Sequence, residues 1–164
     1  MTAAMIPAQY QAVINVALSQ DLPEFYTEGG CGVLAALMAE AAAIYGYGGE
    51  LNLIMRTETG ACHPCVSHIT FIPDDAALDL DIHGPDAEDG WIEFLCDDAR
   101  ENDEDPADID LHNESIRIEF GDDIQTVLEE LTEEQDLTVN VDWVQENYPK
   151  LKSMLIQSIA ALPA

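Results

Sequence analysis

Basic residues are scarce in this sequence. The 164 residues include five lysines and arginines against 33 aspartates and glutamates, which gives a formal net charge of -28. So acidic a chain repels the phosphates of nucleic acids and anionic membranes, and this excludes direct binding to either. The charge favours instead a basic protein surface, which includes one that normally holds DNA or RNA, or a basic protein substrate.

Long hydrophobic runs are missing as well. No stretch approaches the roughly 18 apolar residues that a membrane-spanning helix needs. The first residues lack the basic and apolar regions of a signal peptide, so we expect a cytoplasmic protein (in the host cytoplasm, if a phage encodes it). The four cysteines are then expected to be free thiols.

Repeats and linkers are also lacking, and 48% of the residues are hydrophobic, so a single folded domain over residues 1–164 is predicted. Its parts are a Cys/His/Asp core over 1–85, an acidic region over 86–110 and a C-terminal extension over 111–164. Residues 74–142 hold 26 of the 33 acidic residues. A halophilic domain, which is one alternative for this chain, is expected to spread its acids over every exposed face rather than in such a block.

The hydrophobic periodicity predicts helices and strands in mixed order, which is typical of an α+β fold. The predicted helices are 7–19, 31–45, 122–132 and 144–161, and Pro149 either kinks or begins the last of them. The predicted strands are 51–56, 65–72, 77–82, 115–120 and 137–141. Within the acidic region 86–110, residues 91–96 suit either a short helix or a short strand, and the dense like charges around Pro106 predict an exposed loop.

A cysteine framed by glycines opens the second predicted helix. The amino terminus of a helix carries about half a positive charge, which stabilises a thiolate at Cys31. Gly29 and Gly30 permit a sharp turn there and a close approach of the backbone to a substrate. The amide of Cys31 is placed to donate to an oxyanion, a contact worth about 3 kcal/mol in a transition state.

A histidine and two aspartates follow Cys31 in the order of a nucleophile, its base and the group that orients the base. His68 lies in the predicted strand 65–72, and the next strand carries Asp79 and Asp81. A four-residue turn between these strands sets His68 opposite Asp81, whereas a two-residue turn sets it opposite Asp79. Both registers keep the same face, so the sequence leaves the partner open.

Three segments together resemble the core of transglutaminase-like and papain-like cysteine proteins, especially small phage and bacterial members. They are 29–37 (GGCGVLAAL), 67–71 (SHITF) and 78–81 (LDLD). The resemblance implies a helix with cysteine at its N-terminus, packed on a small antiparallel sheet. It implies Cys31 as the nucleophile, His68 as the base and Asp79 as the orienter. Gln20 is the nearest glutamine before Cys31 for an oxyanion contact.

The function predicted from these residues is thiol-dependent acyl transfer at an amide, by hydrolysis, deamidation or transamidation, without a metal or cofactor. The simpler alternative is that Cys31 is a small buried core residue. The spacing of residues 62–65 (CHPC) also suits zinc, but a second ligand pair is not evident. Residues 103–110 suit calcium by composition but lack the central glycine and final glutamate of an EF-hand loop.

The acidic block supports a different function. Side chains that imitate nucleic-acid phosphates would occupy the basic groove of a partner, as acidic phage inhibitors of host defence do. In this alternative the thiol-protein fold is a scaffold without catalysis. The residues predicted to bind such a partner are Asp97, Asp98, Glu101, Asp103, Glu104 and Asp105.

Overall fold

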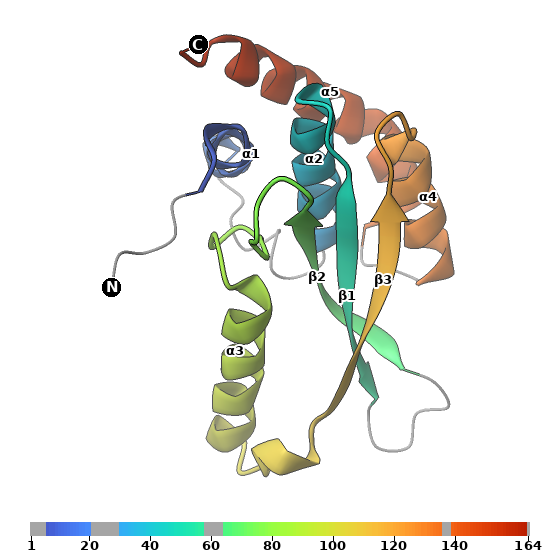
Figure 1. Cartoon of the computed structure of the whole chain (residues 1–164). Coiled ribbons are helices and arrows are strands. Elements are labelled where there is room, and N and C mark those ends of the chain that lie inside the picture. Colours follow the sequence, from blue (N-terminus) through green and yellow to red (C-terminus); the bar gives the residue numbers. More distant parts are fainter. Residues whose placement is uncertain (1–5, 21–29, 58–63, 136–138, 164) are drawn as a thin grey trace.

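The computed structural model describes residues 6–20, 30–57, 64–135 and 139–163. Within these ranges the chain has a mixed α+β fold of five α-helices and one three-stranded antiparallel sheet (Figure 1). The helices are α1 (Ala8–Ser19), α2 (Cys31–Ile44), α3 (Ala87–Glu101), α4 (Ile124–Glu134) and α5 (Val141–Ala160). The strands are β1 (Gly49–Thr57), β2 (Cys65–Pro73) and β3 (Asp110–Ile118). No helix in the described ranges has both the length and the apolar character of a membrane span. The α+β class predicted from the sequence is confirmed.

The sheet has the order β2-β1-β3, so β1 is the central strand. Side chains alternate between the two faces of a strand, and Leu51, Leu53 and Met55 of β1 point into the core. Ile69 and Phe71 of β2 join them, which directs the neighbouring His68 and Thr70 to the opposite face. His68 nevertheless has no exposed surface, because other segments cover this face as well.

Helix α2 is the centre of the molecule. Every residue from Cys31 to Ala42 is buried, whereas an amphipathic surface helix buries only one stripe. The helix packs against both β1 and β2 and against α1, α4 and α5 (Figure 1). Its alanines permit this close approach from several sides. The sequence predicted that this helix extends to Tyr45, but α2 ends at Ile44 and the Tyr45 side chain is 48% exposed.

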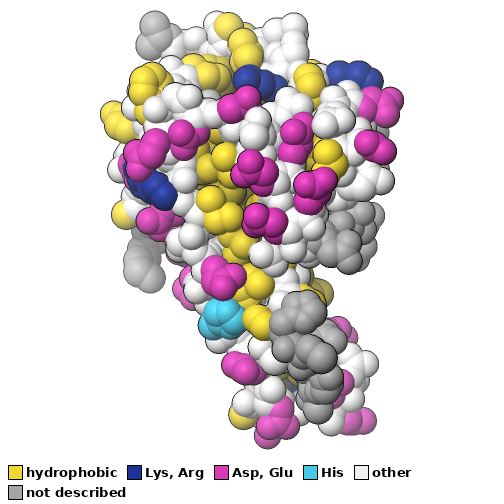
Figure 2. All heavy atoms as spheres, turned by 90° about the vertical axis from the view of Figure 1, so that its right-hand side faces the viewer, with side chains coloured by type: hydrophobic (Ala, Val, Ile, Leu, Met, Phe, Trp, Pro, Cys, Tyr) yellow, Lys and Arg dark blue, Asp and Glu magenta, His cyan; other side chains and the backbone are white. Residues whose placement is uncertain are grey.

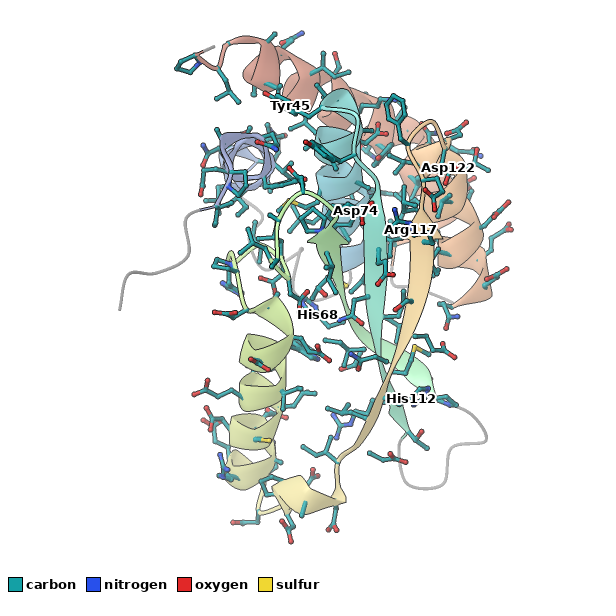
Figure 3. The ribbon with its side chains drawn as sticks, viewed as in Figure 1. Tyr45, His68, Asp74, His112, Arg117 and Asp122 are labelled. Atoms are coloured by element: carbon teal, nitrogen blue, oxygen red, sulfur yellow. The ribbon has the colours of Figure 1, made fainter. Side chains whose placement is uncertain are left out.

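A few polar contacts fix the outer elements on this core. The Tyr10 hydroxyl of α1 donates to Asp75 at 2.5 Å, beyond the end of β2. Lys152 of α5 lies 2.9 Å from the buried carboxylate of Glu40 on α2. Figure 3 shows Arg117 of β3 and Asp74 close together, and these two side chains form an ion pair across the end of the sheet.

The predicted strand 77–82 is wrong as an element of the sheet. Only isolated bridges form there, from Phe71 to Leu80 and from Asp81 to Gly84. The Phe71–Leu80 pair also matches neither of the two predicted registers. The chain turns instead, because Gly84 adopts a φ of 100° and the Asp81 side chain accepts the amide hydrogen of His83 at 2.7 Å.

The acidic region 86–110, predicted as mostly loop, is helical over Ala87–Glu101, so the short helix that was one alternative for 91–96 is part of the longer α3. Around Pro106, where an exposed loop was expected, the chain forms the short 3₁₀ helix η2 (Pro106–Asp108). Ala87, Leu95 and Ala99 are buried along one face of α3, and Trp91 lies between them at the same spacing of four residues. The acids point elsewhere, and two of them lie in the first turn, where a helix favours negative charge.

The C-terminal part differs from the prediction at its second strand. Of the predicted strand 137–141, residues 137 and 138 lie outside the described residues, residues 139 and 140 form no strand, and Val141 already begins α5. Asn140 caps this helix, since its side chain accepts the amide hydrogen of Trp143 at 2.8 Å. Pro149 lies inside α5 rather than at its start.

The start of β1 tolerates no side chain. A Cβ atom on Gly49 would lie 2.5 Å from the ring of Phe71 and 2.6 Å from the carbonyl oxygen of Ile72. Gly49→Ala is therefore expected to lower the free energy of unfolding by about 1–3 kcal/mol, measured by urea denaturation. Gly90→Ala in α3 is the control, because nothing lies within 4 Å of its added Cβ and alanine favours helix by up to about 1 kcal/mol. Equal effects at the two glycines would contradict the packing described at Gly49.

Candidate active site

Cys31 is the first residue of α2 and is 6% exposed. The helix begins at Gly30, whose carbonyl accepts the amide hydrogen of Leu34 at 3.1 Å. No side chain among the described residues caps this end, and the first turn contains no acidic residue. The partial positive charge of the helix terminus is therefore left to act on the sulfur atom of Cys31.

His68 comes to the site from β2, next to an irregularity in the strand. The pairing with β1 shifts between Ile54 and Met55, so that Ser67 is left unpaired beside His68. A β-bulge of this kind bends the strand and redirects a neighbouring side chain. Figure 3 shows His68 on the side of β2 that faces α3.

The two ring nitrogens of His68 have different surroundings. Nε2 lies 2.8 Å from Oδ2 of Asp81, while Nδ1 is buried and has no hydrogen-bond partner of normal geometry among the described residues. Cys31 is among the groups that raise the pKa of the ring. With Nε2 taken by Asp81, any further proton exchange by the ring would have to use Nδ1.

These neighbours favour the protonated ring. Burial acts to lower the pKa of His68, but the hydrogen bond to Asp81 and the interaction with Cys31 outweigh it and raise the pKa to about 9. Asp81 is itself held in place, because its other oxygen, Oδ1, accepts the amide hydrogen of His83. Both oxygens of this carboxylate are therefore engaged, which fixes the orientation of the His68 ring.

The two aspartates that the sequence left open have separate contacts. Asp81 contacts His68, whereas Oδ2 of Asp79 accepts the amide hydrogen of Glu88 at 3.0 Å at the start of α3. Burial raises the pKa of Asp79 above its ordinary value. Asp79, which the resemblance implied as the orienter, thus holds α3 in place in this structure.

Trp91 was not among the residues predicted for the site. Its ring stacks on His68, with ring centroids 4.4 Å apart and planes 17° apart, and its indole N–H donates to Ser67 Oγ at 2.9 Å. Trp91 therefore covers the ring of His68 from α3. The only signal in the sequence was the spacing of four residues along 87–99, which the surrounding acids obscured.

A cavity of about 620 Å³ lies beside this group of residues. Two of its lining residues, Asp81 and Trp91, contact His68 directly. The remaining lining residues are His83, Pro85, Asp86, Ala87, Gly90 and Phe94.

The acidic residues predicted to bind a partner lie elsewhere. All six are exposed, at the C-terminal end of α3 and in the turn after it, and Asp97 pairs with Arg100 at 3.0 Å. Figure 1 places this end of α3 at the opposite end of the molecule from α5. Acidic side chains are also spread over the face with β3 and α4, where basic ones are few (Figure 2).

Other candidate residues contribute little to this site. Cys62 and His63 of the zinc-like motif lie outside the described residues, and Cys65 is an exposed free thiol. Within the described ranges, no three His, Cys, Asp or Glu side chains gather as a metal site would require. The Gln20 amide contacts Ser19 and Met154.

Comparison with family models, curated proteins and solved structures gives no match for this chain.

The pairing of His68 with Asp81 rather than Asp79 can be measured. Asp81→Asn is expected to lower the pKa of His68 by more than about one pH unit from its value near 9, because burial still disfavours the charged ring once the carboxylate charge is removed. The measurement is an NMR titration of the imidazole C–H signals. Asp79→Asn is the matched control and is expected to change the pKa of His68 by less than half as much. An equal fall in both variants, or in neither, would contradict this assignment.

Proposed function

We propose that this protein is a thiol-dependent acyl-transfer enzyme that acts on amide bonds, with Cys31 as the nucleophile. The observation that carries the proposal is the arrangement around His68. Asp81 holds one ring nitrogen at 2.8 Å, and the other is left for the thiol at the start of α2. A nucleophile, a base and an orienting carboxylate have these relations in thiol catalysis.

The protonation of His68 supports a thiolate–imidazolium pair. With a pKa of about 9, its ring is protonated at neutral pH and carries a positive charge beside Cys31. The thiolate attacks the amide carbon, and a carbon–sulfur bond forms. His68 then donates its proton to the departing nitrogen as the carbon–nitrogen bond breaks. The resulting thioester is released by water, in hydrolysis or deamidation, or by an amine, in transamidation.

Backbone groups at the start of α2 are suited to the developing negative charge on the substrate oxygen. The amide of Cys31 belongs to the first turn, where amide hydrogens have no partner within the helix. A donor in such a position is worth about 3 kcal/mol in the transition state. Gln20 is not proposed for this role, since its amide contacts Ser19 and Met154.

We also infer that the fold is of the papain-like and transglutaminase-like kind. The confirmed α+β class supports this, as does a helix that carries cysteine at its N-terminus and packs on an antiparallel sheet that carries histidine. The acidic surface adds a preference for basic protein substrates.

Alkylation rates test the state of the thiol. An ordinary thiol has a pKa of about 8.5 and is almost wholly protonated at pH 6. Cys31, although buried, is expected to react with iodoacetamide at pH 6 at least about tenfold faster than the exposed Cys65, because the proposed function pairs it with the protonated ring of His68. Peptide mass spectrometry measures both rates in one sample. His68→Gln is expected to remove the advantage of Cys31.

Turnover is tested on an unfolded basic protein, such as lysozyme that has been reduced and blocked with neutral carboxamidomethyl groups. New amino termini report hydrolysis, released ammonia reports deamidation, and ammonia together with incorporation of an added amine reports transamidation. Cys31→Ala is expected to abolish all of these, and Asp81→Asn to lower the rate by about a hundredfold or more. The proposal of a thiol-dependent enzyme would be refuted if Cys31 were alkylated more slowly than Cys65 at every pH and the Cys31→Ala variant still turned over the substrate.

The acidic end of α3 supports a second function, in which the protein occupies the basic groove of a partner in place of nucleic acid. The six acids there are exposed and, within 86–110, Arg100 is the only lysine or arginine. Such a surface attracts a basic groove. The attraction extends over about 10 Å at 0.1 M ionic strength, because salt screens the charges at longer distances.

This second function is tested by changing all six acids to Asn or Gln. Retention of the protein on an immobilised DNA-binding protein is expected to fall by at least about tenfold at 0.1 M salt, since charge attraction provides the binding. Six matched changes are the control for net charge, and they lie on β3, directly after β3 and on α4, at Glu114, Glu119, Glu129, Glu130, Glu133 and Glu134. An equal loss of retention in both sets of variants would mean that only the total charge matters. No loss of retention in either set would refute the proposal that the acids imitate nucleic acid.

A further inference from the structure

The cavity next to His68 is not used by the reaction steps above. We propose that it binds a basic side chain, arginine or lysine, that lies next to the amide attacked by Cys31 in a protein substrate. The inference rests on the proposed function, which supplies the amide and the position of the substrate.

The cavity is within reach of a substrate bound at His68. Trp91 forms part of its wall and lies 4.4 Å from His68 between ring centroids. Asp81 also lines it and lies 2.8 Å from the same ring. A side chain of arginine or lysine length on a neighbouring substrate residue spans such a separation. The volume of about 620 Å³ falls in the range of small-ligand pockets.

The walls suit a long side chain with an apolar stem. Pro85, Ala87, Trp91 and Phe94 supply apolar and aromatic surface. Trp91 and Phe94 stack on one another, with ring centroids 5.1 Å apart, and Phe94 is still 55% exposed. Apolar stems of lysine and arginine cover such surfaces, and their cations are attracted to aromatic rings.

The charge of the lining selects a cation. It contains Asp81, Asp86 and His83 but neither lysine nor arginine. Asp81 is already engaged by His68 and the backbone, whereas the exposed Asp86 makes no capping bond to α3 although it precedes that helix. A carboxylate at the rim of an aromatic cavity is the group that a guanidinium or ammonium ion pairs with. A neutral or acidic side chain would leave this charge without a partner.

Gly90 keeps the cavity open. It lines the cavity from within α3, and a Cβ atom at this position would meet nothing within 4 Å. Glycine inside a helix costs about 1 kcal/mol relative to alanine, so its presence here is not explained by helix stability. A larger side chain at position 90 would extend into the open space.

The experiment uses the full chain with Cys31→Ala, so that binding is measured without reaction. Acetylated tetrapeptide amides Ala-X-Gln-Ala, with X as arginine, lysine, norleucine or glutamate, are added to ¹⁵N-labelled protein. The indole N–H signal of Trp91 reports occupation of the cavity, and that of Trp143 on α5 serves as the reference. The arginine and lysine peptides are expected to bind at least about tenfold more tightly than the norleucine peptide, and the glutamate peptide least of all.

Three further variants locate the binding. Gly90→Leu is expected to weaken the binding of the arginine peptide by at least about tenfold. The variant is expected to fold, since leucine is a better helix former than glycine. Asp86→Asn is expected to reduce the preference for arginine over norleucine to about threefold or less, and asparagine tolerates the left-handed φ of 59° at this position. Asp98→Asn, an equal charge change farther along α3, is expected to alter binding by less than about twofold.

The proposal is overturned if norleucine binds as well as arginine, if Gly90→Leu has no effect, or if no peptide moves the Trp91 signal. Equal effects of Asp86→Asn and Asp98→Asn would also overturn it, because net charge alone would then explain the preference. Binding in the Cys31→Ala protein does not depend on catalysis. Failure of the alkylation and turnover tests would therefore refute the enzymatic function without affecting the binding result. Failure of the binding test would refute the proposed role of the cavity without affecting the enzymatic function.

Discussion

The burial of α2 on every side is the constraint on which the rest of the structure depends. Helix ends fray unless packing holds them, but the sheet and three other helices enclose this helix, so its first residue has a defined place. Cys31 is that residue, and its sulfur has little freedom beyond the rotation of one bond. In the proposed reaction the base must therefore come to the thiol, and the irregularity at Ser67 together with Asp81 gives His68 its orientation.

The proposed thiol chemistry is compatible with a net charge of -28, because the groups involved act over different distances. The contact of His68 with Asp81 is 2.8 Å long and buried, where charges interact strongly. The exposed acids at the end of α3 act through solvent, and salt screens them beyond about 10 Å at 0.1 M. Local contacts therefore decide the protonation of His68, while in the proposed function the distant acids attract a basic partner.

The sequence predicted the elements that bear Cys31 and His68, because each is a mostly apolar run bounded by glycine or proline. It left the aspartate open, since the register between Phe71 and Leu80 depends on a turn whose geometry Gly84 and local side-chain bonds determine. Periodicity also could not reveal that α2 is enclosed on all sides, because this depends on elements distant in sequence. The prediction for α3 failed because twelve acids within 83–110 outweighed four correctly spaced apolar residues.

That failure has a physical meaning for function. The catalytic candidates and the acidic block were treated as separate parts of the chain, but α3 belongs to both. A helix has two faces, and here one presents Trp91 to His68 while acids such as Asp98 lie exposed. In the proposed function, a basic protein attracted to the exposed acids meets the same helix that forms one wall of the cavity. We therefore infer that the acidic charge and the group of Cys31, His68 and Asp81 serve one function rather than two.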